Sequence, residues 1–377
     1  MRIAIVINTS WNIYNFRMNF VKALLEQGHE VHTIAPEDDY TSLLTGIGCN
    51  HHNVYMDSRG ANPIKDFALI VELTMLYKKV KPDVILHYTI KPNVYGSMAA
   101  ALTGIPAVNN VCGLGTVFLK EGLVSKIAKF LYKISFRFPK KVFFQNPDDL
   151  QLFLDKKIID QRKTELLPGS GIDLQQFVPS TFKRNSTFTF LVVSRILFDK
   201  GILEYIEAIK ILKAKGIKAK FQLLGAKDPE HKRGVPLADI QAWIAQGLIE
   251  YLGKTNDVRP YLDAADCIVL PSYREGSPRS LMEAAAMSKP IVTTNVPGCN
   301  QVVVGGFNGL LCEPHNPEDL ANKMLQMMKL SDATLQLMGE CGRRKMELEF
   351  SDTIIVDSYT KVLHKLNHDA VVTQMLK

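Results

Sequence analysis

The sequence lacks the features that would place it across a membrane, outside the cell or around a metal cluster. None of its apolar runs approaches the roughly 18 residues that span a bilayer. Its first residues, MRIAIVIN, lack the length and cleavage site of a signal peptide. The six cysteines are scattered, with no C-x-x-C pair and no His/Cys cluster at ligand spacing. We therefore expect a cytoplasmic protein whose cysteines are buried thiols.

Glycine is absent from the segment that joins the first predicted strand to the first predicted helix. A dinucleotide-binding protein would carry G-x-G-x-x-G here, but this chain has NTSWNIYNFR at residues 8–17. A dinucleotide could not approach that backbone closely, which weakens a dehydrogenase interpretation. Asn12, Asn15 and Arg17 instead supply polar groups after the first strand.

Short apolar runs alternate with helical patterns along the chain, which predicts an α/β protein with parallel sheets covered on both faces. The expected strands in the first half lie at residues 2–8, 30–36, 51–56, 83–89, 107–111 and 141–146. The pattern restarts after a turn-rich segment, with strands at 188–196, 220–225, 249–253, 267–272, 290–295 and 308–314. Because 377 residues exceed a typical single core, we expect two doubly wound, Rossmann-like domains.

The turn-rich segment sets the expected domain boundary. We place the N-terminal domain at 1–175 and the C-terminal domain at 176–351. Residues 352–377 are expected to form a helix, up to about Leu366, that crosses back to the N-terminal domain and ends in a frayed tail. The two domains would face each other across a cleft, with ligands at the carboxyl ends of the strands.

Two glutamates bracket the start of a predicted helix in PSYREGSPRSLMEA, residues 271–284. Ser277 would be its N-cap and Pro278 its first residue. The helix is almost entirely apolar except for Glu283, and a buried carboxylate needs a hydrogen-bonding partner. Glu275 and Glu283 could contact points roughly 8 Å apart on a ligand, with free helix amides between them. The alternative is that Glu275 is a surface residue and Glu283 pairs with a buried Arg or Lys.

Two cations follow the strand predicted at 188–196. Arg195 ends that strand and Lys200 precedes a helix. Together they could bracket a diphosphate leaving group and neutralise the charge that develops on it. Taken singly, each could be a solvated cation.

The N-terminal half offers weaker candidates. HYTIKPNVYG, residues 87–96, supplies His87, Lys91 and Asn93, and a lone strand histidine such as His87 is more often structural. Lys91 and Arg17 are candidates for holding an acceptor's phosphate. A flexible loop follows with Gly113 and Gly115.

The net charge of +7 is concentrated in one segment, because residues 120–141 hold seven basic residues and one acidic residue. Five of the basic residues recur at helical spacing beside an apolar stripe: Lys126, Lys129, Lys133, Arg137 and Lys140. This pattern favours contact with an anionic membrane surface. The alternative is a solvated helix whose apolar side packs on its own domain. Nucleic acid is not an expected partner, since no aromatic-interleaved basic groove is present.

The motifs VSRILFDKG, PSYREGSPRSLMEA and GFNGLLCEP together resemble the family-4 retaining glycosyltransferases, which have the GT-B fold. The family's paired glutamates match Glu275 and Glu283, and its phosphate-binding cations match Arg195 and Lys200. By this resemblance, Glu283 would bind the ribose of the donor, and the turn around Lys254 would lie beside its nucleotide base. The resemblance assigns the donor sugar to Glu275 and to a loop made of Gly276, Ser277, Pro278 and Arg279.

The N-terminal half is similar to a narrower group through KPNVYG and GLGTVF. That group includes a bacterial N-acetylgalactosaminyltransferase acting on undecaprenyl-diphosphate-bacillosamine, with relatives in capsule and O-antigen assembly. It implies an acceptor site with Asn15, Arg17, Lys91, Asn93, Gly113 and Gly115. The implied location is peripheral, on the inner face of the cytoplasmic membrane.

The chain departs from the family at two places. NTSWN replaces a two-glycine loop after the first strand, and Gln301 stands where the family often has a glutamate. No D-x-D occurs, so no metal or other cofactor is expected, and a UDP-sugar would be the co-substrate. The expected activity is retaining transfer of an N-acetylhexosamine, such as GalNAc, to a polyprenyl-diphosphate-linked saccharide. A nucleotide-sugar epimerase and a non-catalytic sugar-nucleotide sensor remain the alternatives.

Overall fold

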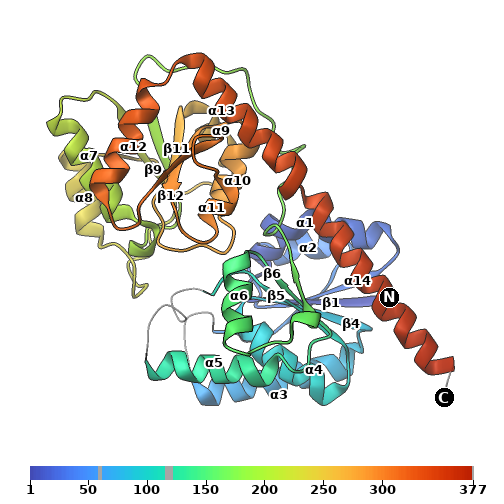
Figure 1. Ribbon diagram of the computed structural model, residues 1–377. Helices are drawn as coiled ribbons and strands as arrows, with labels where there is room; N and C mark the ends of the chain where they lie inside the picture. Colours follow the sequence, from blue (N-terminus) through green and yellow to red (C-terminus); the bar gives the residue numbers. More distant parts are fainter. Residues whose placement is uncertain (58–61, 115–121, 376–377) are drawn as a thin grey trace. The chain divides into compact units, whose positions relative to one another are not determined.

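The computed structural model describes residues 1–57, 62–114 and 122–375. The chain divides into two compact units (Figure 1). The first unit combines Met1–Gly171 with Asp352–Lys377, and the second is Ile172–Ser351. The division after Gly171 lies slightly before the boundary of 175 expected from the sequence, and residues from Asp352 onward belong to the first unit.

The first unit is built on a seven-stranded parallel sheet of order β3-β2-β1-β4-β5-β6-β7. Its strands are β1 (Arg2–Val6), β2 (Glu30–Ala35), β3 (Asn50–Asn53), β4 (Val84–Tyr88), β5 (Ala107–Val111), β6 (Lys141–Phe144) and β7 (Thr164–Leu166). The strand order reverses direction between β1 and β4, which makes the carboxyl ends of these two strands the switch point of the sheet.

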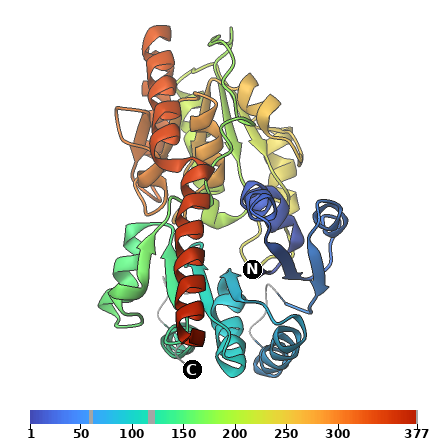
Figure 2. The ribbon, with the colours of Figure 1, turned by 90° about the vertical axis from the view of Figure 1, so that its right-hand side faces the viewer.

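Helices cover both faces of this sheet (Figures 1 and 2). They are α1 (Ser10–Glu26), α2 (Thr41–Gly46), α3 (Pro63–Val80), α4 (Ser97–Thr103), α5 (Leu123–Ser135), α6 (Pro147–Asp155) and α14 (Asp352–Met375), with short helices η1 (Pro92–Gly96) and η3 (Gln161–Lys163). The bounds of α3 are set locally, because the Asn62 side chain accepts from two first-turn amides, Pro63 opens the helix and Lys81 takes a left-handed conformation after it.

The second unit has a six-stranded parallel sheet of order β10-β9-β8-β11-β12-β13. Its strands are β8 (Thr189–Val193), β9 (Lys220–Leu224), β10 (Glu250–Tyr251), β11 (Cys267–Leu270), β12 (Ile291–Thr294) and β13 (Gly309–Cys312). Its helices are η4 (Phe198–Lys200), α7 (Ile202–Ala214), α8 (Leu237–Ala245), α9 (Arg259–Ala264), α10 (Arg279–Ala286), α11 (Cys299–Val302), α12 (Pro317–Lys329), α13 (Asp332–Lys345) and η5 (Met346–Phe350). The switch point here lies between β8 and β11.

The expected parallel α/β pattern is confirmed in both halves, with three corrections. β7 was missed, because its sequence TEL carries no apolar run. The helix α14 continues to Met375 rather than ending near Leu366 in a frayed tail. Four of the six free cysteines are buried as expected, but Cys112 and Cys341 are only half-buried.

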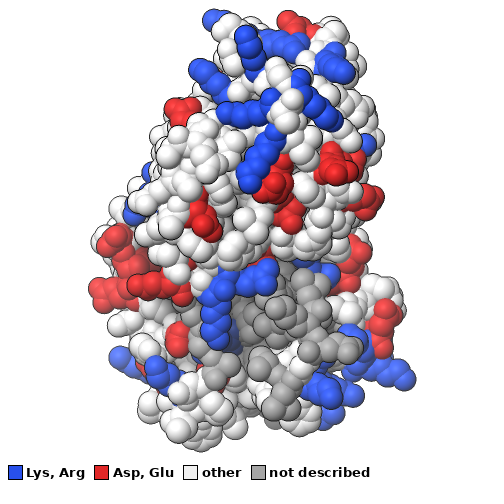
Figure 3. All heavy atoms as spheres, turned by 90° about the vertical axis from the view of Figure 1, so that its left-hand side faces the viewer, with Lys and Arg blue, Asp and Glu red and all other residues white. Residues whose placement is uncertain are grey.

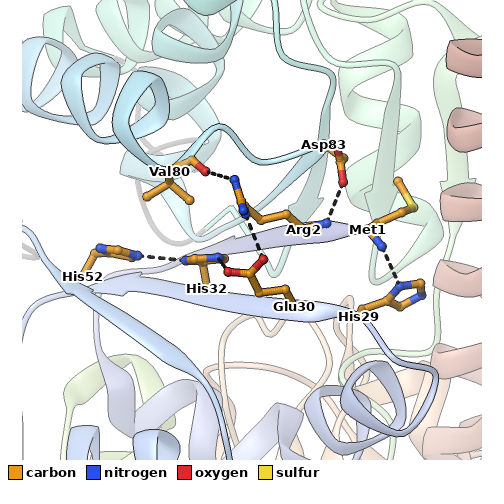
Figure 4. Close-up of polar contacts among 8 residues, drawn as sticks. All are labelled: Met1, Arg2, His29, Glu30, His32, His52, Val80 and Asp83. Atoms are coloured by element: carbon orange, nitrogen blue, oxygen red, sulfur yellow. Dashed lines mark hydrogen bonds and ion pairs between the residues drawn. The ribbon is translucent and has the colours of Figure 1, made fainter.

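Polar contacts fix the first strands of the sheet near the N-terminus (Figure 4). Arg2 on β1 donates from its backbone amide to Asp83 (2.6 Å) and from Nε to Glu30 Oε2 on β2 (3.0 Å). Glu30 Oε1 in turn lies 2.8 Å from His32 Nε2, and His32 Nδ1 lies 2.9 Å from His52 Nε2 on β3. The chain of contacts therefore crosses three neighbouring strands.

Candidate functional site

The switch point of the second unit brings together two of the residues singled out from the sequence. Lys200 ends η4, which follows β8, and Glu275 lies in the loop that follows β11. Lys200 Nζ donates to Glu275 Oε1 at 2.5 Å, although the two residues are 75 positions apart. Their side chains are 20% and 13% exposed, so this ion pair is largely sheltered yet reachable from solvent. A cation and a carboxylate thus meet at the edge where open α/β sheets bind ligands.

The turn that carries Lys200 is held against the Glu275 loop by backbone packing. Gly201 has φ +70°, and a Cβ atom there would collide with the carbonyl oxygen of Pro271. The backbone amide of Tyr273 and the Ser272 hydroxyl both donate to the Asp199 carbonyl, at 3.0 and 3.1 Å. These contacts fix the position of Lys200 before any ligand arrives.

A second glycine supports the other side of the Glu275 loop. The Glu275 amide donates to the Pro297 carbonyl at 3.0 Å. Gly298 has φ +86°, and a Cβ atom there would meet the backbone of Glu275. Gln301, the departure from the family's usual glutamate, accepts at Oε1 from the Gly298 amide. The change at 301 therefore acts on the loop that supports Glu275.

Glu283 is buried on α10, and its partner is Arg279 one turn earlier, at 2.9 Å. Burial raises the pKa of the Glu283 carboxyl, and the nearby Arg279 guanidinium opposes that rise. The pairing is the alternative left open from the sequence, an arginine partner for Glu283. Arg279, expected in the donor-sugar loop, is thus engaged with Glu283 in the protein without ligand.

The start of α10 differs from expectation. The helix begins at Arg279, and Pro278 is its N-cap residue, without a side-chain capping bond. Ser277 was expected to cap the helix, but its hydroxyl donates instead toward Met282 Sδ at 3.5 Å. The prediction failed because a serine followed by proline matches the usual cap pattern, whereas here the helical conformation starts one residue later.

Two further donor-side candidates, Arg195 and Lys254, are exposed, whereas Gly276 is half-buried. Arg195 follows the carboxyl end of β8. Its turn packs closely against Gly225, because a Cβ atom added at that position would collide with the Ser194 carbonyl. Lys254 follows β10. Within the described part of the chain, neither side chain has an ion pair or hydrogen bond, so both cations are available to a ligand.

The acceptor-side candidates of the first unit are mostly occupied by other protein groups. Arg17 is buried, bonds to Asn12 and lies 4.1 Å from the centre of the Tyr88 ring. Lys91 Nζ lies 2.6 Å from Asp66 Oδ1, a buried carboxylate.

Four further candidates in that unit supply local structure or lie outside the described residues. Asn15 donates to the Trp11 carbonyl at 2.9 Å. Asn93 is 1% exposed and donates to the Asn110 carbonyl at 2.8 Å, while its own Oδ1 has no partner within the described residues. Gly113 has φ +125° after β5. Gly115 lies outside the described residues.

Two features near the switch points were not predicted. Thr89, at the carboxyl end of β4, has φ +65°, which is rare for a β-branched residue, and its buried Oγ1 has no partner among the described residues. Strain of this kind gathers at functional sites. In the second unit the Tyr273 hydroxyl donates to both oxygens of Glu204 at 2.8 Å. No local sequence signal marks Thr89 or Glu204.

His87 has the structural role that the sequence favoured. It is fully buried, its Nδ1 donates to Asn109 Oδ1 at 2.9 Å, and its Nε2 accepts from the Tyr77 hydroxyl at 3.0 Å. Burial lowers its pKa to about 4, so the ring is neutral near pH 7.

The basic segment is only partly helical. α5 carries Lys126, Lys129 and Lys133, but Arg137 and Lys140 lie beyond its end, which corrects the continuous helical stripe expected from their spacing. Ile127 and Phe130 on α5 are 50% and 63% exposed, so much of the apolar side does not pack on its own unit. Figure 3 shows Lys and Arg side chains gathered at the lower right of one face of the molecule.

The fold and the site define a class of protein. Two parallel doubly wound units are the architecture of GT-B glycosyltransferases, and Lys200 and Glu275 meet at the switch point of the second unit. A UDP- and glucose-bound structure of Anabaena HepE superposes with a TM-score of 0.79, at 18% identity, over 97% of this chain and 99% of that one. A glycosyltransferase structure from Rickettsia africae gives 0.78 at 20% identity, over 97% and 98%.

Sequence comparisons identify the family. Residues 2–146 match the model described as glycosyl transferase 4-like, and residues 187–330 match glycosyl transferases group 1. The chain is 30% identical, over 97% of its length and 99% of the relative's, to the N,N'-diacetylbacillosaminyl-diphospho-undecaprenol alpha-1,3-N-acetylgalactosaminyltransferase of Campylobacter jejuni. An Escherichia coli UDP-Gal:alpha-D-GlcNAc-diphosphoundecaprenol alpha-1,3-galactosyltransferase is 26% identical over 79% of each chain. The chain belongs to the family-4 glycosyltransferases.

Proposed function

We propose that this glycosyltransferase moves an N-acetylhexosamine, such as GalNAc, from a UDP-sugar to a polyprenyl-diphosphate-linked saccharide, with retention of anomeric configuration. The observation that carries the proposal is the Lys200–Glu275 contact at the switch point of the second unit. The names of the Campylobacter jejuni and Escherichia coli relatives support the choice of a polyprenyl-linked acceptor.

In this proposal Lys200 and Arg195 bind the diphosphate of the donor. The exposed Arg195 and the largely sheltered Lys200 would face the negative charge that grows on the diphosphate as it departs. Lys200 is already paired with Glu275, so donor phosphate has to share or displace that carboxylate. Glu275 would then accept hydrogen bonds from sugar hydroxyls. Binding of the sugar would therefore release Lys200 to bind the diphosphate.

The rest of the donor follows from the same placement. Glu283 would accept from the ribose hydroxyls, which requires its bond with Arg279 to loosen or to be shared. Lys254 would lie beside the base. The loop residues Gly276, Ser277, Pro278 and Arg279 would line the sugar, with the amides at the start of α10 as additional donors.

Chemistry on one face of the sugar accounts for retention without a separate general base. The bond between the anomeric carbon and the UDP oxygen breaks while the acceptor hydroxyl oxygen bonds to the same face. The hydroxyl proton passes to a phosphate oxygen of the departing UDP. The cationic groups Arg195 and Lys200, with helix amides, would stabilise the leaving group in place of a metal ion.

The first unit would bind the acceptor through its switch point. Lys91 and Arg17 would face the acceptor diphosphate only if Asp66 and Asn12 release part of their contacts. Asn15, Asn93, Gly113 and Gly115 complete the proposed acceptor site. The Oδ1 atom of the buried Asn93, which has no partner among the described residues, supports this placement, because buried polar atoms usually have partners.

A peripheral position on the inner face of the cytoplasmic membrane would bring the enzyme to such an acceptor. The lysines of α5 and its exposed Ile127 and Phe130 suit an anionic lipid surface. No helix in the described part of the chain is both long and apolar enough to cross a bilayer.

The direct test is UDP release from a panel of UDP-sugars, with EDTA throughout, with and without a short-chain polyprenyl-diphosphate saccharide. We expect release from one donor that depends on the acceptor, with product NMR showing the donor's anomeric configuration. Loss of activity in EDTA, or an inverted product, would contradict the corresponding part of the proposal. An epimerase would instead convert a UDP-sugar without acceptor, and a sensor would bind UDP-sugar without releasing UDP.

A further inference from the structure

The helix α3 has two apolar faces, and packing accounts for only one of them. Leu69, Leu73 and Tyr77 point into the core of the first unit. On the opposite side, Ile64, Val71 and Met75 are 82%, 42% and 60% exposed. Their spacing of seven and four residues places them in one stripe, which spans about 16 Å along the helix.

The exposed stripe is wider than these three side chains. Phe67 on the same side of α3 is 68% exposed, and Ala68 lies within the stripe and is also exposed. Tyr55, just after β3, is 64% exposed, with Lys65 Nζ 5.6 Å from the centre of its ring. Single exposed apolar residues are ordinary, but a contiguous patch of this kind marks an interaction surface.

The same helical layer carries other exposed apolar residues. α3, α4 and α5 lie side by side along one face of the seven-stranded sheet (Figures 1 and 2), and both α3 and α5 contact η1. Leu102 on α4 is 68% exposed, and α5 adds Ile127 and Phe130.

The charges around this layer indicate what it contacts. Lys65, Lys78 and Lys79 on α3 and Lys126 and Lys133 on α5 are exposed, whereas α5 carries no acidic residue. Of the two acidic residues on α3, Asp66 is buried against Lys91 and Glu72 accepts from the Tyr55 amide. Exposed apolar side chains among exposed lysines complement an anionic bilayer, in which the side chains enter the acyl boundary and the lysines remain at the head groups.

We propose that the outer side of α3 is a membrane-binding surface that acts with α5, so that the first unit lies on an anionic bilayer through a two-helix face. This extends the proposed function, which places membrane contact in the α5 segment alone and on which it rests for the location of the acceptor. Because α3 and α5 would contact the bilayer at two separate places, they would fix the tilt of the first unit on the surface as well as attach it.

The test is flotation of the full-length protein with vesicles of phosphatidylglycerol and phosphatidylethanolamine, compared with phosphatidylcholine alone. The variant combines Phe67→Gln, Val71→Gln and Met75→Gln, which keep helix-forming side chains at exposed positions. The matched control combines Leu337→Gln and Leu348→Gln, two positions of the second unit that are each 60% exposed. We expect the α3 variant to lose at least about tenfold in affinity for anionic vesicles, and the control to bind like wild type.

Wild-type vesicle affinity in the α3 variant, with its melting temperature unchanged, would overturn the proposal. A second copy of the chain is the rival occupant of this face. It would be indicated if sedimentation showed a wild-type dimer that the α3 variant abolishes while vesicle binding stays the same. UDP release with the short-chain acceptor separates the two proposals: the α3 variant should retain it, and absence of release in wild type would count against the transferase assignment alone.

Discussion

Lys200 and Glu275 carry the donor-site assignment at the scale of single residues. We expect Lys200→Ala and Glu275→Ala each to lower turnover by at least about tenfold, equivalent to roughly 1.4 kcal/mol of barrier. In the proposed donor site, loss of Lys200 would remove the positive charge that faces the leaving diphosphate. Loss of Glu275 would remove a hydrogen-bond acceptor for the sugar hydroxyls and would leave Lys200 without its partner at 2.5 Å. Steady-state UDP release measures both effects.

The helix that follows Lys200, α7, offers a control for these two substitutions. Lys210 on α7 forms an exposed ion pair with Glu207 at 2.7 Å. Surface pairs of this kind contribute little, so Lys210→Ala should leave turnover and stability nearly unchanged. Wild-type turnover in Lys200→Ala and Glu275→Ala would remove the basis of the donor-site assignment.

His87 should make the first unit sensitive to acid. Its pKa is about 4 in the folded protein against 6.5 in the unfolded chain, because burial disfavours the charged ring. A depressed pKa means that the unfolded state binds the proton first, so stability present above pH 6.5 is lost as the pH falls toward 4. We expect a loss of about 2 kcal/mol between pH 7 and pH 5 from this group.

Urea unfolding at the two pH values in wild type and His87→Gln measures that contribution. The variant should be less stable at pH 7, since Tyr77 and Asn109 lose a partner, but its stability should fall less between pH 7 and pH 5. An equal pH dependence in the two proteins would show that His87 is not the titrating group.

Single residues also show what the sequence could reveal about the site. The proximity of Lys200 and Glu275 was predictable, because each follows a recognisable strand and neighbouring parallel strands have their carboxyl ends at the same edge of the sheet. The Lys91 pair with Asp66 was not predictable, since it joins the residue that precedes η1 to a residue of α3 25 positions earlier in the chain. The strained backbone at Thr89 was not predictable either, because no sequence pattern indicates that a β-branched residue takes a positive φ.

At the scale of a structural element, the turn before α7 determines whether Lys200 reaches Glu275. Gly201→Ala should place a methyl group against the Pro271 carbonyl and strain a backbone with φ +70°. We expect weaker UDP binding and at least about a tenfold loss of turnover, since the turn has to move away from β11. Isothermal titration with UDP and steady-state assays measure the two effects.

Gly216, just beyond the other end of α7, supplies the matched control. It has φ +73°, but a Cβ atom there would have nothing within 4 Å. Gly216→Ala should therefore cost about 1 kcal/mol of strain without changing UDP binding. Equal effects of the two substitutions on UDP affinity would show that the contact with Pro271 does not position the site.

Elements with a strong periodic pattern and local end signals were the predictable ones. α3 was expected at 63–80 and has those bounds, because Asn62, Pro63 and Lys81 mark both ends. β7 has three residues and pairs only with β6, so its strand conformation depends on a neighbour rather than on its own side chains. The outer face of α3 could have been noticed from its apolar spacing, but only the structure shows which of its two apolar sides is covered.

At the scale of the whole molecule, the first unit is discontinuous in sequence. α14 follows the second unit in the chain but packs on α1, and Ile355, Tyr359 and Leu363 join the core formed by β1 and β4. The Tyr359 ring centre lies 4.7 Å from that of Phe20. The Tyr359 hydroxyl accepts from Asn110 Nδ2 at 3.0 Å. The stability of residues 1–171 therefore depends on a helix that starts only at Asp352, after the whole of the second unit.

Tyr359→Ala should accordingly destabilise the first unit by about 3–5 kcal/mol, the usual cost of removing a buried aromatic ring. Hydrogen exchange followed by mass spectrometry should show faster exchange in Met1–Gly171 and in α14, with Ile172–Ser351 unchanged. Val371→Ala, at an exposed position of the same helix, is the control and should leave exchange in both units as in wild type. Faster exchange in the second unit after Tyr359→Ala would mean that the units do not open separately. Protection that persisted throughout the first unit would mean that α14 contributes little to its core.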